Sequence, residues 1–285
     1  ISRRYAGTDA NAKITFAEGS DAAAQYYWYS SVVNADNASK VNGTDEEIVV
    51  TLSSAASGSV AAGGGSAAGN TNMEMWLYDR SGFNTVVAGR YHEGAEPTNA
   101  TTQDAETHLL VNTHEQWASD QKEWVVGGSW NVAQNADSYV TVQEGNILTL
   151  VGGTYGANQG GDTHVYVDGG TIAEVFAGVY DPYENANLYG NVNNSNLIIT
   201  GGTLGLRTDD VRKRVYGGSY YGTVSGNVNV VVEGNATITE LVGGGYAGSV
   251  TGDITLDLIS GTITRVDASG VGNSSVGGDV LVNLH

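Results

Sequence analysis

The chain has 285 residues, of which 41 are glycine, 2 are proline and none is cysteine, and its formal net charge at pH 7 is −19. This much glycine without a Gly-X-Y period, and with so little proline, excludes collagen. The lack of cysteine excludes disulfides and thiolate metal sites. The negative charge excludes nucleic acid and anionic membranes as partners, because both would repel the chain. No apolar run reaches the length of about 18 residues that a membrane-spanning helix needs, so we expect no direct membrane insertion.

The first 85 residues show little regularity. Residues 13–16 and 47–52 alternate like short strands, and residues 53–69 form a Ser/Ala/Gly tract whose side chains are too small for a substantial core. We expect residues 1–85 to be an irregular N-terminal β region of degenerate coils, with the tract as a surface loop. A separate small domain is the alternative.

From residue 86 onward the sequence repeats itself. The element small-Gly-x-aromatic occurs six times, with its aromatic residues 39, 25, 25, 40 and 26 positions apart. Three of these intervals define a period of 25 or 26 residues, and the two longer ones indicate that period plus an insertion. The six aromatic positions are Tyr91, Trp130, Tyr155, Tyr180, Tyr220 and Tyr246.

Two further elements recur within each period. One is Gly-Asp or Gly-Asn followed by an alternating apolar run, as in Gly161-Asp162-Thr163-His164-Val165. The other is a short segment such as Gly169-Gly170-Thr171-Ile172. Each unit therefore contains about three short strands joined by glycine-rich corners, and a strand this short buries its apolar face only by stacking on equivalent strands. The pattern predicts an all-β fold, a single-stranded parallel β-helix (β-solenoid) of about 25 residues per coil with two loop insertions, over residues 86–285.

The last residues, 279–285, stop inside a predicted strand, and no polar cap follows. We therefore expect the solenoid to be truncated here from a longer repeat protein. The alternative is a terminal coil that pairs with another molecule.

The units at residues 215–228 and 241–254, Val-Tyr-Gly-Gly-Ser-Tyr-Tyr-Gly-Thr-Val-Ser-Gly-Asn-Val and Leu-Val-Gly-Gly-Gly-Tyr-Ala-Gly-Ser-Val-Thr-Gly-Asp-Ile, resemble the Gly-rich repeats of bacterial autotransporter passenger domains and related surface adhesins. The resemblance covers about residues 85–285. It implies a right-handed β-helix displayed on, or released from, a bacterial surface. No C-terminal membrane barrel accompanies it in this sequence.

Two sets of residues recur at equivalent positions. The aromatic set is expected to form a structural ladder along the solenoid, since adjacent coils lie about 4.8 Å apart; an outward-facing strip that binds sugar rings is the alternative. The second set is expected to cap backbone N–H groups at a corner, and the alternative is a Ca²⁺ site. This corner set comprises Asp162, Asn227, Asp253 and Asp279.

The second insertion concentrates charge. Residues 207–214 hold four of the twelve basic residues of the chain, and the candidate binding residues here are Arg207, Asp209, Asp210, Arg212 and Arg214. β-Helix lyases and hydrolases resemble this arrangement in placing carboxylates and arginines on one face. Adjacent aspartates on a strand would point apart, however, so they make a poor acid–base pair. A solvated loop is the simpler interpretation. Insertions are nevertheless common binding sites on solenoids, and the segment from Glu93 to His114 is the other candidate.

The remaining motifs are uninformative. The five histidines show no metal-ligand spacing, and no nucleotide or nucleophile motif occurs in context. We therefore expect no catalytic residue, no metal and no cofactor. The favoured function is an extracellular, surface-displayed, non-enzymatic adhesin or passenger segment that binds glycans or host and cell-surface proteins. The alternatives are a β-helix polysaccharide lyase or glycoside hydrolase, and a structural fibre that self-associates end to end.

Overall fold

A computed structural model of the chain describes residues 2–4, 27–29, 48–53, 58–64, 73–78, 83–92, 98–113, 122–182, 190–205 and 214–285. Over these residues the structure is all-β and contains no helix. Its strands belong to two long parallel sheets and one short one. None of the described residues forms a helix that could cross a membrane.

The nine-stranded sheet has its strands in the order in which they occur along the chain. Each pair is parallel and in register, so Val140, Val165 and Leu197 lie side by side on successive strands. The strands are β3 (Ile48–Ser53), β5 (Met73–Tyr78), β8 (Thr107–Asn112), β11 (Ser138–Glu144), β13 (Thr163–Val167), β15 (Ser195–Ile199), β18 (Val228–Val232), β20 (Ile254–Leu258) and β22 (Val280–Leu284).

The eleven-stranded sheet contains the other described strands of the chain, apart from β7 and β10. Its members are β1 (Ser2–Arg4), β2 (Tyr27–Tyr29), β4 (Gly58–Gly64), β6 (Phe83–Tyr91), β9 (Lys122–Val126), β12 (Asn146–Val151), β14 (Thr171–Phe176), β16 (Thr203–Leu204), β17 (Val215–Tyr216), β19 (Thr237–Val242) and β21 (Thr262–Asp267). Strands before and after residue 85 therefore share both sheets, because β3 and β5 pair on toward β8 while β4 pairs with β6.

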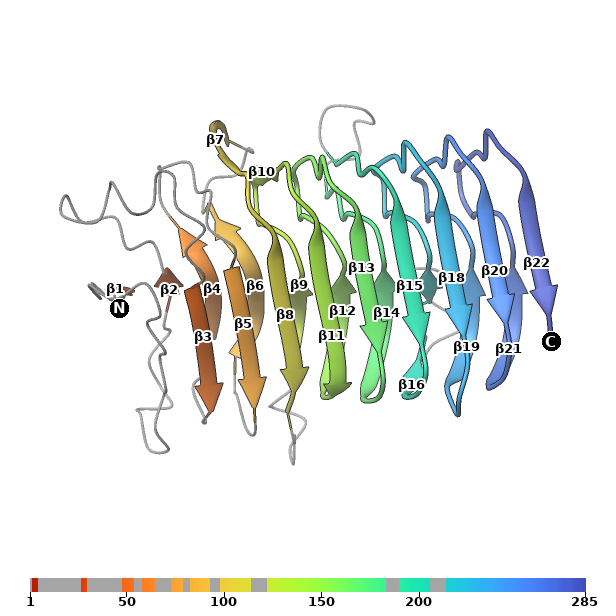
Figure 1. Cartoon of the computed structure of the whole chain (residues 1–285), viewed down its shortest axis with the longest axis horizontal. Coiled ribbons are helices and arrows are strands. Elements are labelled where there is room, and N and C mark those ends of the chain that lie inside the picture. Colours follow the sequence, from red (N-terminus) through yellow and green to blue (C-terminus); the bar gives the residue numbers. More distant parts are fainter. Residues whose placement is uncertain are drawn as a thin grey trace.

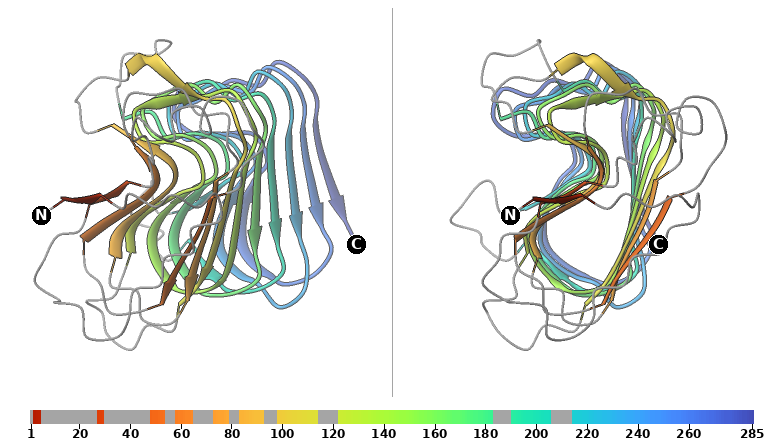
Figure 2. Two further views of the ribbon diagram at one scale, coloured as in Figure 1. Left: turned by 60° about the vertical axis from the view of Figure 1, so that its left-hand side comes forward. Right: turned by 90° about the vertical axis from the view of Figure 1, so that its left-hand side faces the viewer.

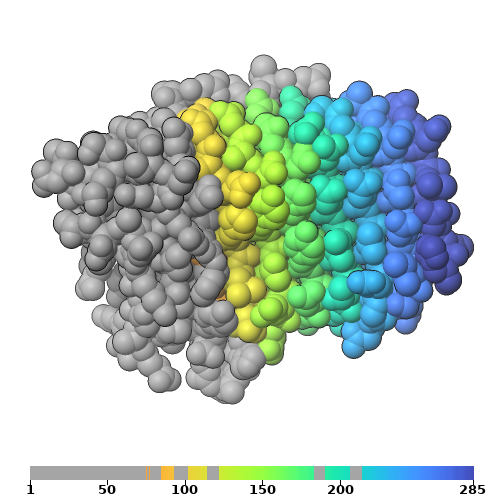
Figure 3. All heavy atoms as spheres, in the orientation of Figure 1, coloured from red at the N-terminus to blue at the C-terminus, as the bar shows by residue number. Residues whose placement is uncertain are grey.

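The chain thus passes alternately through the two sheets, which face each other along the long axis of the molecule (Figure 1). We call one such passage a coil. The space-filling view shows successive coils as bands stacked along this axis (Figure 3). Every described strand pair is parallel, which fits a β-solenoid.

The aliphatic core lies between the sheets. Strands of the nine-stranded sheet alternate buried and half-buried residues, as the period of two requires, and β13 buries Val165 and Val167. Facing them, β14 buries Ile172 and Val175. Each such side chain contributes roughly 1.5–3 kcal/mol when it is removed from water. Stacked coils repeat this contribution from β5 to β20.

In the coils from β9 onward, the chain makes a narrow lobe, which we call the arm, on its way from the eleven-stranded sheet to the next strand of the nine-stranded sheet; residues 152–162 form the arm of one coil (Figure 2). A short sheet of β7 (Thr98–Gln103) and β10 (Val132–Gln134) lies in it. In the coils that contain Gln103, Gln134 and Gln159 the interior of the arm is polar. Gln103, Gln134 and Gln159 lie in register and are buried, and Gln134 Nε2 donates to Thr107 Oγ1 at 2.9 Å.

Farther along the axis the arm becomes apolar, because a row of valines occupies its interior: Val192, Val224, Val250 and Val276. The polar part also holds Arg90, which is 3% exposed and donates from Nε to Gln103 Oε1 at 3.2 Å. Burial lowers the pKa of this arginine, although the nearby Asp104 opposes the shift. The core of the arm is therefore not the same from one end to the other.

Three expectations about loops were wrong. Residues 58–64 of the Ser/Ala/Gly tract form β4, because small side chains do not prevent backbone pairing with β6. The proposed loop from residue 93 to 114 contains β7 and β8, and β8 buries Leu109 and Val111. The additional residues in each of the two longer aromatic intervals are also divided between two places. Between Tyr180 and Tyr220, the segments Ser195–Ile199 and Thr203–Leu204 pair in regular register with the preceding coil, so the additional residues lie before and after these segments.

Candidate functional site

The six repeated aromatic residues form one continuous stack. Each follows the bend between the eleven-stranded sheet and the arm, and neighbouring rings come from adjacent coils. The inner rings are almost parallel, with interplanar angles of 11°, 3°, 5° and 10°. The ring centroids are 5.8 Å apart for Tyr91–Trp130, 3.7 Å for Trp130–Tyr155, 5.4 Å for Tyr155–Tyr180, 4.4 Å for Tyr180–Tyr220 and 5.0 Å for Tyr220–Tyr246.

The stack packs outside the aliphatic core. It covers a row of apolar residues on the outer face of the eleven-stranded sheet, and with them it forms two clusters of its own. That row is Val87, Val126, Val151, Phe176, Tyr216 and Val242. Because each inner ring has a neighbour on both faces, only ring edges remain for solvent. A flat platform for a sugar ring needs an open face, so this stack is a poor sugar site.

Glycine permits the close approach that this bend requires. A Cβ added at Gly152 would lie 2.6 Å from Val165 Cγ2 and still closer to the carbonyl oxygen of Ala177 in the next coil. Neither group can move away, because both belong to the stacked coils. Glycine at position 152 therefore has a packing reason in this coil, whereas Ala88 and Ala177 occupy the equivalent position in two other coils.

A second row on the same outer face is charged. Register places Thr149, Glu174, Arg214, Glu240 and Arg265 side by side on successive strands. Thr149 Oγ1 donates to Glu174 Oε1 at 2.5 Å. Arg214 Nε lies 2.8 Å from Glu240 Oε2, and Arg265 Nη1 lies 3.4 Å from Glu240 Oε1. The side chains of Arg214 and Glu240 are 8% and 2% exposed, so this is a buried ion pair. The sequence analysis did not find this ion row.

The charged insertion starts within the ion row. β16 and β17 are two halves of one strand, because both pair with β14 and with β19. The chain leaves at Gly205 and returns at Arg214, whose Cα would lie only 3.5 Å from a Cβ on Gly205. The insertion therefore opens from the middle of a strand, and the Arg214–Glu240 ion pair holds its return point.

The candidate binding residues divide accordingly. Arg214 is buried in the ion row and serves as an anchor, so the expectation that it contacts a ligand is replaced by a structural role. Arg207, Asp209, Asp210 and Arg212 lie outside the described residues. The neighbouring Tyr216 is fully buried, which raises the pKa of its hydroxyl, while the Arg214 guanidinium partly opposes the shift.

The corner residues form a ladder that links successive coils. The side chains of Asp162, Asn227 and Asp253 accept hydrogen bonds from backbone N–H groups of the following coil, and not from their own turn as in an Asx-turn, whereas Asp279 takes part through its backbone N–H. Asn227 N donates to Asn194 Oδ1 at 2.8 Å, Asp253 N to Asn227 Oδ1 at 2.9 Å and Asp279 N to Asp253 Oδ1 at 2.8 Å. Asp162 likewise accepts from Asn194 N. Asp137 and Asn194 belong to the ladder as well, although the sequence analysis missed both.

The outer face of the nine-stranded sheet carries a smaller stack. Tyr139 lies between His108 and His164, with ring centroids 4.6 and 4.5 Å away and nearly parallel planes. His108 Nε2 lies 3.1 Å from Glu106 Oε2, and Tyr139 donates to Asp137 Oδ2 at 3.4 Å. Burial and the nearby carboxylates raise the pKa of Tyr139. Because the histidines do not converge on a common point, this stack has no metal-ligand geometry.

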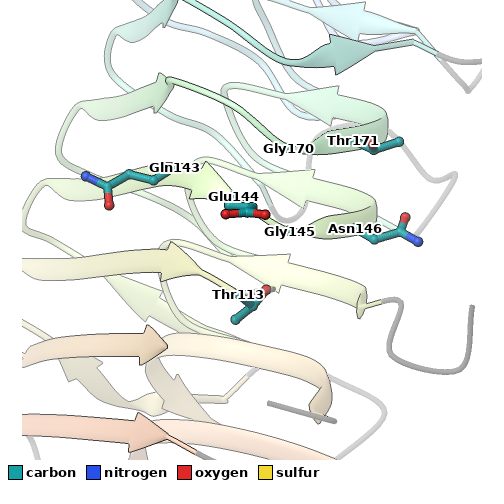
Figure 4. A pocket seen from close by; sticks show the side chains of 7 residues that line it. All are labelled: Thr113, Gln143, Glu144, Gly145, Asn146, Gly170 and Thr171. Atoms are coloured by element: carbon teal, nitrogen blue, oxygen red, sulfur yellow. The ribbon is translucent and has the colours of Figure 1, made fainter. Parts of the chain in front are cut away.

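An open depression of about 530 Å³ lies at the corner between the two long sheets (Figure 4). It is mainly polar, and Glu144 is the one carboxylate in its lining, which consists of Thr113, Gln143, Glu144, Gly145, Asn146, Gly170 and Thr171. A single carboxylate offers neither an acid–base pair nor a metal-binding set. Over the described parts of the chain, no group of three or more His, Asp or Glu side chains could hold a metal ion.

Comparison with known proteins adds no assignment. No protein-family model, curated protein or solved structure matches the chain. The site must therefore be interpreted from its own geometry.

Proposed function

We propose that the chain is part of a single-stranded parallel β-helix on a bacterial surface, and that it acts as a non-enzymatic binding scaffold for acidic glycans. The observation that carries this proposal is the insertion between Gly205 and Arg214. It opens from the middle of a strand in a regular frame, and a buried ion pair anchors its return. Loops on rigid scaffolds commonly carry binding residues.

The charge of the insertion favours an acidic ligand. Arg207, Arg212 and Lys213 fall within a few residues of one another in a chain whose net charge is −19. Arginine suits bidentate contacts with carboxylate and sulfate groups. Elsewhere on this face the described charges are paired, since Glu240 lies against both Arg214 and Arg265. The insertion is therefore the part of the sequence that concentrates the basic residues an acidic ligand would contact.

Deletion of residues 206–213 tests this proposal. Gly205 and Arg214 approach closely enough to be joined directly, as Ala173 and Glu174 are in the preceding coil. We expect the deletion to retain the circular dichroism spectrum and to lower binding to sulfated or uronic-acid polysaccharides at least tenfold. Binding to the intact chain should weaken with salt. Arg207→Gln combined with Arg212→Gln is the milder variant, and Arg265→Gln on the same face is the matched control.

Unchanged polysaccharide binding after the deletion would show that the insertion is not the binding site. Turnover of the same polysaccharides, abolished by Asp209→Ala or Asp210→Ala, would instead establish the enzyme alternative. The surface location has its own test, which is antibody labelling of intact cells: labelling only after lysis would contradict it.

A further inference from the structure

Four tyrosines of the aromatic stack are neighbours without interruption. Tyr155, Tyr180, Tyr220 and Tyr246 give three face-to-face pairs with centroid distances of 5.4, 4.4 and 5.0 Å and interplanar angles of 10° or less. Tyr155, Tyr180 and Tyr246 are half-buried, so part of each ring reaches solvent, whereas Tyr220 is 9% exposed. The neighbouring coils hold each pair in place through backbone hydrogen bonds, among them Tyr220 N to Val179 O and Tyr246 N to Ser219 O.

This arrangement matches the geometry in which two phenoxyl radicals combine. The unpaired electron of a tyrosyl radical has high density on the ring carbons ortho to the oxygen. When two such rings lie face to face, a bond forms between ortho carbons perpendicular to both planes. Stacking in adjacent coils supplies the proximity that free tyrosines lack, and well-oriented partners of this kind react as if at very high concentration.

We propose that the stack of Tyr155, Tyr180, Tyr220 and Tyr246 is a site of oxidative modification, at which a peroxide-dependent peroxidase joins tyrosines of adjacent coils as dityrosine. Each tyrosine gives one electron and its phenolic proton to the oxidant. The two radicals form a carbon–carbon bond between Cε atoms, and the hydrogen on each Cε then moves to the phenolic oxygen. One hydrogen peroxide takes up the two electrons and two protons and leaves as two waters, so the protein loses two hydrogen atoms per cross-link.

The same geometry excludes other tyrosines. Tyr216 stacks on Phe176 at 4.9 Å, and its ring is nearly perpendicular to that of Tyr246. Tyr221 is likewise perpendicular to both Tyr220 and Tyr246. Tyr166, on the outer face of the nine-stranded sheet, has Thr141 and Ile198 as its neighbours in register. Cross-linking should therefore select the stack among the described tyrosines.

A cross-link here would join coils covalently where only hydrogen bonds and stacking join them otherwise. A Tyr180–Tyr220 bond connects residues on either side of the Gly205–Arg214 insertion, so it would close that insertion within a covalent loop. Such a bond constrains the unfolded chain in the way a disulfide does, in a sequence that contains no cysteine. The modification would therefore stabilise the frame independently of any ligand.

Treatment of the dilute chain with hydrogen peroxide and a haem peroxidase tests the proposal. We expect dityrosine fluorescence in a protein that still migrates as a monomer. Tryptic digestion should yield a peptide pair joined through Tyr180 and Tyr220 that lacks two hydrogen atoms. In Tyr220→Phe a ring remains in the stack, but the phenylalanine cannot form a dityrosine bond with either neighbour. Because Tyr220 belongs to two of the three pairs, its dityrosine yield should fall about threefold if the pairs contribute equally.

Tyr166→Phe is the matched control, and its yield should equal that of the unmodified sequence. Tyr246→Phe removes one pair and should lower the yield less than Tyr220→Phe does, which provides a second variant if Tyr220→Phe fails to fold by circular dichroism. Dityrosine that maps outside the stack, that forms only between chains, or that persists in full in Tyr220→Phe would overturn the proposal.

Discussion

Glu240→Gln removes the central carboxylate of the ion row and should destabilise the chain strongly. Glu240 lies between Arg214 and Arg265, whose side chains are 8% and 63% exposed. The exposed Arg265 loses little, because water screens such a pair to less than about 1 kcal/mol. The buried Arg214 keeps its charge but loses its ion-pair partner, and breaking a buried pair costs about 3–5 kcal/mol. Glu174, which lies beside Arg214 in register, offsets part of this loss. We therefore expect the free energy of unfolding, measured by urea denaturation, to fall by at most about 3–5 kcal/mol.

The double variant Arg214→Met with Glu240→Leu isolates the cause. When both charges are replaced by apolar groups of similar size, the buried pair is removed as a unit, and such replacements are often neutral or stabilising. The double variant should therefore be more stable than Glu240→Gln, although it carries more changes. Arg265→Gln, with less than about 1 kcal/mol at stake, serves as the control. A loss in the double variant equal to the sum of the losses in Arg214→Met and in Glu240→Leu, each measured alone, would refute this account, because it would show no coupling between the charges.

Gly152→Ala should lower the unfolding free energy by several kcal/mol, because the new methyl group meets Val165 and the backbone of Ala177; Gly160→Ala, where the nearest atom would be 3.3 Å away, should cost less in the same denaturation assay. Leu197→Ala empties a fully buried core position and should cost about 2–5 kcal/mol, whereas Ile198→Ala on the half-buried outer face should cost less than half of that. Burial raises the pKa of Tyr216, so the folded state holds that proton more tightly than the unfolded chain does. The stability that this provides is complete below about pH 10 and is lost as the pH rises above it; Tyr216→Phe should flatten the alkaline part of a stability-versus-pH curve, and an unchanged curve would contradict the assignment.

The sequence predicts the stacking of coils well because the repeat is carried by rigid requirements. The second residue of the small-Gly-x-aromatic element is glycine in all six copies, as Gly153 is before Tyr155, and a Cβ on Gly153 would lie 2.9 Å from Thr163 Cγ2 and 3.0 Å from Val179 Cγ1. This glycine and the aromatic residue therefore recur together and mark the period. Corner residues are only partly predictable. Asp162 and Asp253 follow glycine, whereas Asp137 follows alanine and Asn194 follows asparagine, so a search for Gly-Asp or Gly-Asn misses two members of the same ladder.

The ion row could not be inferred from spacing alone. Glu174, Glu240 and Arg265 occupy one position of the segments Thr-Ile-Ala-Glu, Thr-Ile-Thr-Glu and Thr-Ile-Thr-Arg, and aligning these segments reveals that this position is charged in all three. Arg214 joins them only because the strand is interrupted and then resumed. The spacing between aromatic residues gives the total number of residues added to a coil, but not how they are divided between its two insertion points. The strand pairing in the structure is therefore needed to locate the point at which the insertion opens.

The corner ladder gives the stack a direction. Each Asp or Asn reaches forward to the amide of the next coil, as Asn227 does to Asp253 and Asp253 does to Asp279. Removing a later coil leaves a carboxylate or amide oxygen that water solvates readily, whereas removing an earlier one deprives a backbone N–H of its acceptor. Loss of coils should thus be easier from the side toward which these side chains point. Fraying is therefore expected to be faster at one end of the stacked coils than at the other. Amide hydrogen exchange at the corner positions, measured coil by coil, would show which end opens first.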